Sequence, residues 1–272
     1  LYYMKKLLLL VITFATFQQF YGQILKGHKH IANDTIYLDF INPFYAPIEA
    51  RLSPLDSTKK FIKVKSYGFI KHNDTLKKAL AIPINRIQDT SKINIKSYLK
   101  FKANFGNPNT DFNENRSYLL SYPKGKRYKI IQSFGGKFSH NEPHSKYAID
   151  FGTKVGDTIT AVRSGKVFFV KEDSKEHCRT KKCINKANKI YILHEDGSMA
   201  HYVHLDFEGA LVDIGDMVEA GQPIAISGMT GFTTIPHLHL VLYKYGGISI
   251  PFYFKGQKRK KLKQGKYYKR KI

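Results

Sequence analysis

The chain has 272 residues, of which 42% are hydrophobic and 14% aromatic. This composition can supply a folded core, and it excludes a wholly disordered or collagen-like chain. The 45 Lys and Arg against 21 Asp and Glu give a formal net charge of +24. Such an excess favours a polyanionic partner, such as nucleic acid, an anionic lipid surface or an anionic cell-wall polymer.

Residues 1–22 have the pattern of a secretory signal peptide. Met4 is followed by two lysines and then by an apolar run over 7–15, and Gly22 is a small residue near the expected cleavage point. The apolar run is shorter than the roughly 20 residues that span a bilayer, so a permanent anchor is the weaker alternative, as is a buried core helix. We therefore predict export, with no stable transmembrane segment after cleavage.

Two cysteines, Cys178 and Cys183, lie close together in a lysine-rich stretch. Export places them in an oxidising compartment, so a disulfide that closes this small loop is the favoured interpretation. A zinc knuckle is a weaker alternative, because only His177 lies beside the pair and structural zinc sites usually have four ligands.

Residues 24–112 predict an N-terminal β domain. Short alternating segments such as 35–40 and 61–65 are separated by Asn-Pro, Ser-Pro and Asn-Asp turn signals, which favours a small sandwich-like arrangement of strands. No clustered His, Cys or acidic residues suggest chemistry there, so its role is left open. The polar, turn-rich stretch 104–115 predicts the connector to a second domain.

One hairpin of the second domain follows directly from the sequence. Residues 189–194 lead through Asp196-Gly197, a favoured tight-turn dipeptide, into a return strand over 199–204. Strict alternation places His204 on one face with Ala200 and Tyr202, and it places His201 on the other face. We therefore expect His201 to point away from His204. Since helical periodicity is absent here, the second domain is predicted to be mostly β.

Residues 235–243 predict a buried strand that carries His237 and His239. Two residues apart on a strand, both imidazoles project from one face, with Cα atoms about 7 Å apart. Asp150 lies in an apolar stretch and is costly to bury unless it is paired or binds a cation. Two His and one Asp, with an open position for water, are typical of a catalytic zinc site.

Residues 130–243 resemble the lysostaphin-type (LytM-like) zinc endopeptidases, which cut peptide bridges in bacterial cell walls. The matching segments occur in the family's order: 138–140, 147–151 (Tyr-Ala-Ile-Asp-Phe), 155–159, 161–167, 202–205 (Tyr-Val-His-Leu), 215–218, 220–224, 227–231 and 236–239 (Pro-His-Leu-His). The resemblance implies a β-rich peptidase domain over 116–254, built on an antiparallel sheet of the duplicated-hybrid type, with one Zn²⁺ per chain.

The resemblance also implies roles for individual residues. Asp150 and His239 match two metal ligands, whereas His204 and His237 match the two other histidines, which activate the water and stabilise the developing oxyanion. The commonest family pattern has the remaining His ligand four residues before the Asp, but Lys146 stands there. We favour His140 as that ligand, because it follows a Gly-Gly-X-Phe-Ser segment like that of a longer-loop branch, and we keep His144 as the alternative.

Residues 255–272 contain ten Lys and Arg and no acidic residue. They predict a flexible basic tail, which is either simply solvated or in contact with an anionic envelope surface. Without these ten residues, 35 basic residues still stand against 21 acidic ones, so the remainder of the chain is basic too.

The sequence as a whole predicts an exported zinc metalloendopeptidase that hydrolyses peptide bonds in peptidoglycan and acts in the periplasm, in the cell envelope or outside the cell. The alternative is an inactive family member that serves as a wall-binding or regulatory module. A nucleic-acid partner is not expected, because the excess of positive charge is the sole feature that suggests one. The sequence does not predict the bond cleaved or the oligomeric state.

Overall fold

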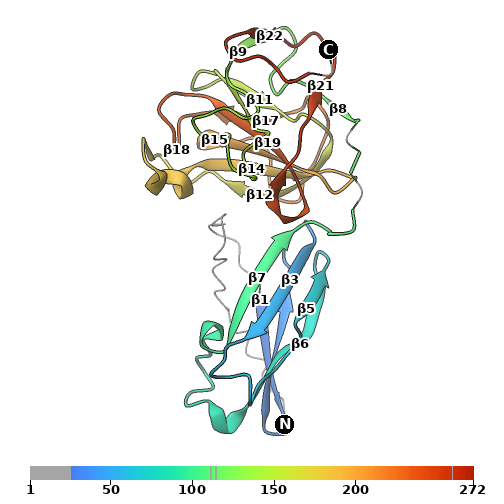
Figure 1. The fold of residues 1–272 in the computed structure, drawn as a ribbon, viewed down its shortest axis with the longest axis vertical. Coiled ribbons are helices and arrows are strands. Elements are labelled where there is room, and N and C mark those ends of the chain that lie inside the picture. The colour runs from blue at the N-terminus through green and yellow to red at the C-terminus, as the bar shows by residue number, and fades with distance from the viewer. Residues whose placement is uncertain (1–25, 111, 114, 259) are drawn as a thin grey trace. The chain divides into compact units, whose positions relative to one another are not determined.

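The computed structural model describes residues 26–110, 112–113, 115–258 and 260–272, so the predicted signal peptide lies outside the described residues. The chain divides into two compact units between Asn107 and Pro108, each of which is mostly β (Figure 1). Within the described part of the chain, no helix is long and apolar enough to cross a membrane.

The N-terminal unit consists of strands and two short 3-10 helices. Its elements are β1 (Lys26–Ala32), β2 (Thr35–Ile41), β3 (Ile48–Pro54), β4 (Lys63–Val64), β5 (Tyr67–Ile70), β6 (Thr75–Pro83), η1 (Ile84–Arg86), η2 (Ile95–Ser97) and β7 (Leu99–Phe105).

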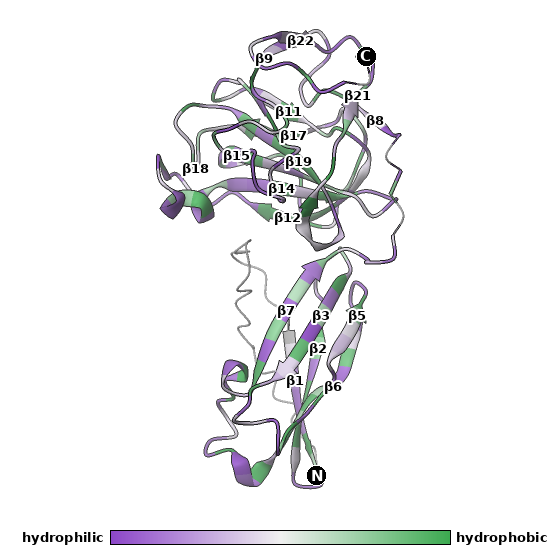
Figure 2. Ribbon diagram, in the orientation of Figure 1, coloured by the Kyte–Doolittle hydropathy of each residue, from purple (hydrophilic) through white to green (hydrophobic). Residues whose placement is uncertain are grey.

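These strands form two sheets, ordered β1-β2-β6-β4 and β5-β3-β7. Along β2 every second residue is buried, as the period of a strand with one covered face requires. Ile36 and Leu38 of β2 share one hydrophobic core with Ile48 and Ala50 of β3. Along β3 and β7 hydrophobic and hydrophilic residues follow one another in the sequence (Figure 2), although their burial does not alternate as strictly as in β2.

The C-terminal unit has more strands and two further 3-10 helices. Its elements are β8 (Ser117–Tyr118), β9 (Arg127–Gln132), β10 (Ile149–Phe151), β11 (Thr158–Thr160), β12 (Gly165–Lys171), β13 (His177–Cys178), η3 (Lys181–Lys186), β14 (Asn188–Leu193), β15 (Met199–Ala210), β16 (Met217–Val218), β17 (Pro223–Ser227), β18 (Gly231–Phe232), β19 (Leu238–Lys244), η4 (Tyr245–Gly247), β20 (Ile248–Ser249), β21 (Tyr253–Phe254) and β22 (Tyr267–Lys269).

A large antiparallel sheet, ordered β16-β12-β14-β15-β19-β10-β9-β22, organises this unit. The predicted hairpin is confirmed: β14 pairs with β15, and Leu193 lies opposite Met199. Gly197 in its turn has φ +75°, a conformation that glycine adopts without a steric penalty. One face of the sheet packs on a core that includes Tyr202 and Leu240.

The segment predicted to be a flexible basic tail is instead part of this fold. β22 pairs with β9, and Leu262 lies in the core with 2% of its surface exposed. The buried guanidinium of Arg270 donates hydrogen bonds to the Tyr122 carbonyl and to Thr160 Oγ1. The prediction of a flexible tail is wrong because it was based on the lysines alone. The apolar and aromatic residues between them pack on the domain and pair with β9.

The predicted disulfide is confirmed. Cys178 and Cys183 are bonded to one another, and the bond joins β13 to η3. β13 also runs parallel to β18, with His177 opposite Gly231. The disulfide loop therefore lies against the segment that leads into β19.

Candidate active site and metal centre

The site is centred on Asp150, in the short buried strand β10. On one side β10 pairs with β19, where Asp150 lies directly opposite His239, and on the other side it pairs with β9, where Asp150 lies opposite Gln132. Side chains directly opposite one another in antiparallel strands project from the same face. The register alone therefore brings these three side chains together.

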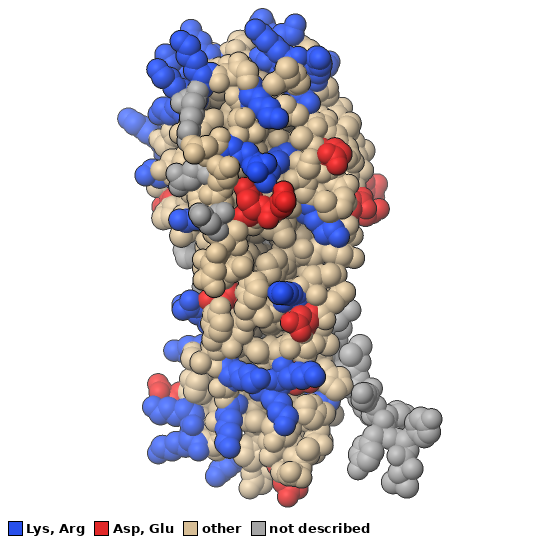
Figure 3. All heavy atoms as spheres, turned by 90° about the vertical axis from the view of Figure 1, so that its right-hand side faces the viewer, with Lys and Arg blue, Asp and Glu red and all other residues tan. Residues whose placement is uncertain are grey.

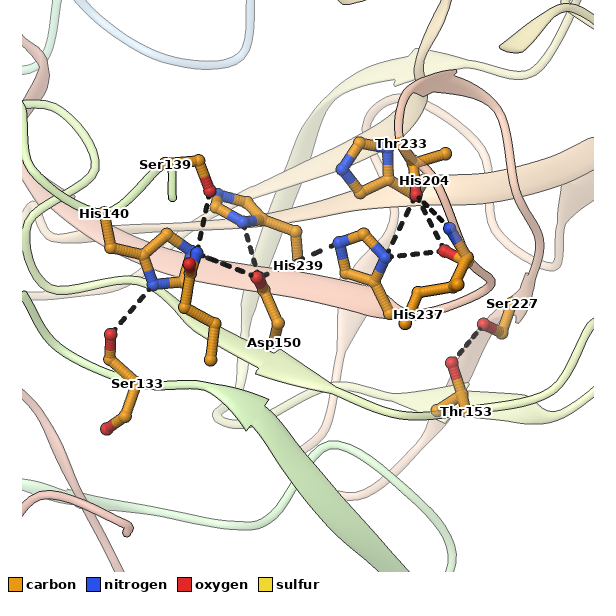
Figure 4. Close-up of polar contacts among 12 residues, drawn as sticks. Ser133, Ser139, His140, Asp150, Thr153, His204, Ser227, Thr233, His237 and His239 are labelled. Atoms are coloured by element: carbon orange, nitrogen blue, oxygen red, sulfur yellow. Dashed lines mark hydrogen bonds and ion pairs between the residues drawn. The ribbon is translucent and has the colours of Figure 1, made fainter. Parts of the chain in front are cut away.

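His140 joins them from the loop between β9 and β10. Its Nε2 lies 3.2 Å from Asp150 Oδ1, and His239 Nδ1 lies 2.8 Å from the same oxygen. Each of the three residues offers one ligand atom, and these atoms all lie within 4.8 Å of one another. Figure 4 shows the three side chains pointing toward a common centre.

The ring of His140 is fully buried, and its Nδ1 lies 3.0 Å from the Ser133 carbonyl. Because a carbonyl only accepts, Nδ1 carries the proton and Nε2 of the neutral ring carries a lone pair. Nε2 has no hydrogen-bond partner among the described residues. A buried polar atom without a partner is costly, and a metal ion at this point would satisfy it.

The donor set also fits a metal. Two imidazole nitrogens and one carboxylate oxygen are the ligand types that Zn²⁺ prefers, and three protein ligands leave one tetrahedral position open, as in catalytic zinc sites. Burial acts to raise the pKa of Asp150, but the imidazoles of His237 and His239 outweigh it and hold the pKa of the carboxyl well below its usual range. Asp150 is therefore ionised, as a ligand must be.

Gln132 supports the carboxylate from behind. Its Nε2 donates to Asp150 Oδ2 over 3.2 Å and to Ser139 Oγ over 2.7 Å. The amide thus occupies one carboxylate oxygen and leaves Oδ1 to face the two histidines. Gln132 was not predicted from the sequence. Its position at the end of an alternating segment could have indicated a polar side chain on the buried face of a strand.

His204 reaches the site through a bulge in β15. Val203 pairs with Lys189 and Leu205 pairs with Asn188, so His204 is an extra residue in the ladder, with φ +67°. A bulge redirects a side chain. The ring of His204 lies against that of His237, with centroids 4.5 Å apart, and its centroid is 6.0 Å from that of His239.

The predicted alternation in β15 is therefore wrong at His204, because strict alternation would have placed it on the core face with Tyr202. His201 lies on the same face as His239, since it pairs with Val241, but it lies farther along the sheet. Its ring is buried against Tyr191 and Tyr243. His201 takes no part in the cluster.

His204 and His237 are both held through Nδ1 by backbone carbonyls. His204 Nδ1 lies 2.7 Å from the Thr230 carbonyl, and His237 Nδ1 lies 2.9 Å from that of Ile235. In the neutral state both therefore present a free lone pair on Nε2. His237 Nε2 lies 3.9 Å from Asp150 Oδ1. Burial lowers the pKa of His204 well below its usual value, so its ring is neutral at pH 7.

The structure thus brings together all five residues singled out from the sequence: His140, Asp150, His204, His237 and His239. The candidate metal cluster contains His140, and the alternative His144 is not part of it.

A second cluster, not expected from the sequence, lies in the N-terminal unit. His28, His30 and Asp39 also offer ligand atoms within 4.8 Å of one another. The expectation of no clustered His or acid in that unit is therefore wrong. The two histidines at alternate positions were a usable signal, but their acidic neighbour lies on the next strand.

Part of the C-terminal unit is similar in sequence to known proteins. Residues 144–251 match the model of peptidase family M23. Peptidoglycan DD-endopeptidase ShyB of Vibrio cholerae is 34% identical over 124 residues, which cover 43% of this chain and 26% of that protein. Lysostaphin of Staphylococcus simulans is 35% identical over 94 residues, which cover 34% of this chain and 17% of lysostaphin.

A solved structure of Staphylococcus simulans lysostaphin aligns with a TM-score of 0.33 and 32% identity, covering 42% of each chain. The chain spans only part of the length of these curated relatives: 33% of an uncharacterized metalloprotease of Buchnera aphidicola and smaller shares of ShyB and lysostaphin. The matched segment includes Asp150, His204, His237 and His239, and residues 144–251 are therefore a peptidase family M23 domain.

Proposed function

We propose that the C-terminal domain is a zinc metalloendopeptidase that hydrolyses peptide bonds of bacterial peptidoglycan. The observation that carries this proposal is the cluster of His140, Asp150 and His239, whose ligand atoms lie within 4.8 Å of one another. The substrate class is supported by relatives named for peptidoglycan and glycyl-glycine endopeptidase activity.

In this proposal zinc would be held by His140 Nε2, Asp150 Oδ1 and His239 Nδ1. These are the atoms that face one another in the structure. Zinc held by these residues would supply a bound water of lowered pKa and a Lewis acid for the substrate carbonyl. His140 precedes the segment that matches the family model, so its assignment rests on geometry rather than on that match.

His204 and His237 serve proton transfer and oxyanion support. Each is fixed through Nδ1, so each presents Nε2 as the working atom. A neutral imidazole accepts the proton of the attacking water, and a protonated one donates to the developing oxyanion or to the leaving amine. Because burial lowers the pKa of His204, this residue suits the role of proton acceptor at neutral pH.

We also place the protein in the cell envelope or outside the cell, because peptidoglycan is found there. The disulfide between Cys178 and Cys183 supports an oxidising compartment. The face drawn in Figure 3 carries more Lys and Arg than Asp and Glu. We infer that this excess, including the exposed lysines of 255–272, attracts the protein to an anionic envelope surface.

The test combines zinc content with peptidoglycan digestion analysed by mass spectrometry. The wild type should release defined peptide fragments, and His140→Ala and His239→Ala should each lose that activity together with about one zinc ion per chain. His144→Ala, outside the cluster, is the matched control and should retain both. If His239→Ala cleaves peptidoglycan as well as the wild type, the mechanism is wrong. A zinc-loaded wild type that releases no fragments would instead indicate the non-catalytic module.

A further inference from the structure

The second cluster lies on the β1–β2 hairpin of the N-terminal unit. His28 is directly opposite Asp39 in the ladder, and His30 is two residues farther along β1, on the same face. The Nδ1 atom of each histidine lies 3.7 Å from Asp39 Oδ2. Two nitrogens and one oxygen thus gather at one point of the sheet.

These distances suit a shared metal ion better than direct hydrogen bonds. At 3.7 Å a ring nitrogen is too far from an oxygen to make a hydrogen bond. Two ligands at about 2.0–2.1 Å from a tetrahedral ion lie about 3.3 Å apart. A shift of a few tenths of an ångström would therefore bring the three donors into coordination.

A β-bulge holds the carboxylate of Asp39 in position. The register between β2 and β6 shifts between Leu38 and Phe40, and on the β6 side Lys78 adopts φ +51°. Its backbone N–H donates to Asp39 Oδ1 over 2.6 Å. One carboxylate oxygen is thus bound by the backbone while Oδ2 faces the histidines, an arrangement that orients metal ligands elsewhere.

The ring of His30 is also held in place. It stacks on Tyr37, directly opposite in the ladder, with centroids 5.2 Å apart. The side chains of His28, His30 and Asp39 are 25%, 36% and 14% exposed, so the site is partly buried and open to an ion from solvent.

We propose that His28, His30 and Asp39 form a second metal site, independent of the peptidase centre. Two imidazoles and a single carboxylate select nitrogen-preferring ions, namely Zn²⁺, Ni²⁺ or Cu²⁺, over Mg²⁺ and Ca²⁺, which take mainly oxygen ligands. The ion would tie β1, at the edge of its sheet, to β2. It would therefore stabilise the N-terminal unit against unfolding.

The test is a calorimetric titration of the full chain with Zn²⁺ at neutral pH, in the His239→Ala background so that the peptidase centre does not contribute. We expect about one ion per chain, with a dissociation constant in the micromolar range or below and a higher melting temperature of the N-terminal unit. Mg²⁺ should give neither effect.

Two variants decide the assignment. His28→Ala should abolish this binding, and so should Asp39→Asn, which keeps an oxygen to accept the Lys78 N–H and so preserves the bulge. His72→Ala, in the same unit but outside the cluster, is the matched control and should bind as before. Unchanged zinc binding in folded Asp39→Asn, or no binding in the His239→Ala background, would overturn the proposal.

Discussion

His204, in β15, and His237, which directly precedes β19, lie with their ring centroids 4.5 Å apart, although simple alternation along β15 would place His204 on the other face of the sheet. The contact depends on the bulge in β15, where His204 takes φ +67°. Its position is thus determined by the backbone, together with the hydrogen bond to the Thr230 carbonyl.

His204→Ala is expected to separate catalysis from metal binding. Because His204 is outside the ligand cluster, the variant should retain zinc, yet it should lose about 10²-fold or more in cleavage rate, the usual loss for a general base. The measurement pairs zinc analysis with initial rates on purified peptidoglycan fragments. His144→Ala should keep the wild-type rate. Loss of zinc from His204→Ala would show that the residue acts on the metal centre.

Gln132→Ala should weaken metal binding without removing a ligand. The amide donates to Asp150 Oδ2, and loss of such a supporting hydrogen bond costs about 10- to 100-fold in metal affinity. Competition with a chelator of known affinity measures the change. Gln264→Ala, at an exposed position, serves as the control. Equal zinc affinity in the two variants would exclude this role for Gln132.

Stability should rise with pH between about 4 and 6.5, partly because of His194. Burial lowers the pKa of His194 to about 4. Between that pH and the usual value near 6.5 the unfolded chain binds a proton that the folded chain does not, so stability is lost as pH falls. The effect of His194 is on the order of 3 kcal/mol at most. Urea denaturation at pH 5 and pH 7 should show a smaller difference for His194→Gln than for the wild type; an equal difference would refute the assignment.

Arg270→Ala should destabilise the C-terminal domain, because it removes the hydrogen bonds to the Tyr122 carbonyl and Thr160 Oγ1. Loss of a buried charge-assisted hydrogen bond costs about 1.5–3 kcal/mol. Lys271→Ala, at an exposed neighbouring position, should leave the free energy of unfolding nearly unchanged. If urea denaturation gave equal values for both variants, the C-terminal segment would not be held as described.

Attachment to the envelope should depend on salt. Substituting Glu for the exposed Lys258, Lys260 and Lys261 should reduce binding to isolated envelopes at low ionic strength. The difference from the wild type should shrink as salt rises, because screening weakens attraction between exposed charges. Cleavage of small soluble fragments is the control and should be unaffected. Envelope binding that does not vary with ionic strength would contradict the electrostatic interpretation.

Several features were predictable from the sequence because they follow from local periodicity. The apolar run 235–243 predicted a strand and the Asp196-Gly197 turn predicted a hairpin, and both are present, although the strand begins at Leu238 rather than at residue 235. That His140 and His239 lie close together was implied only by the family resemblance, because their separation in the sequence does not indicate a contact.

What the sequence could not show depends on backbone irregularity and tertiary pairing. An inserted residue at His204 reverses its face, and nothing in the alternation of 199–204 signals it. Asp39 meets His28 and His30 only through the β1–β2 register. Leu262 is buried although the residues around it are mostly basic and exposed. The composition of 255–272 alone therefore wrongly indicated a flexible segment.

If the proposed metal centre is correct, Nε2 of His140 makes the stability of this domain depend on metal supply. Without an ion, this fully buried nitrogen has no hydrogen-bond partner among the described residues and its lone pair faces the Asp150 carboxylate, so on the proposed function the metal-free fold is expected to be the less stable one. We expect the amount of intact protein to follow the availability of zinc, because starved chains unfold more often and are degraded. A cell short of zinc would then hold fewer copies of the protein as well as a less active one.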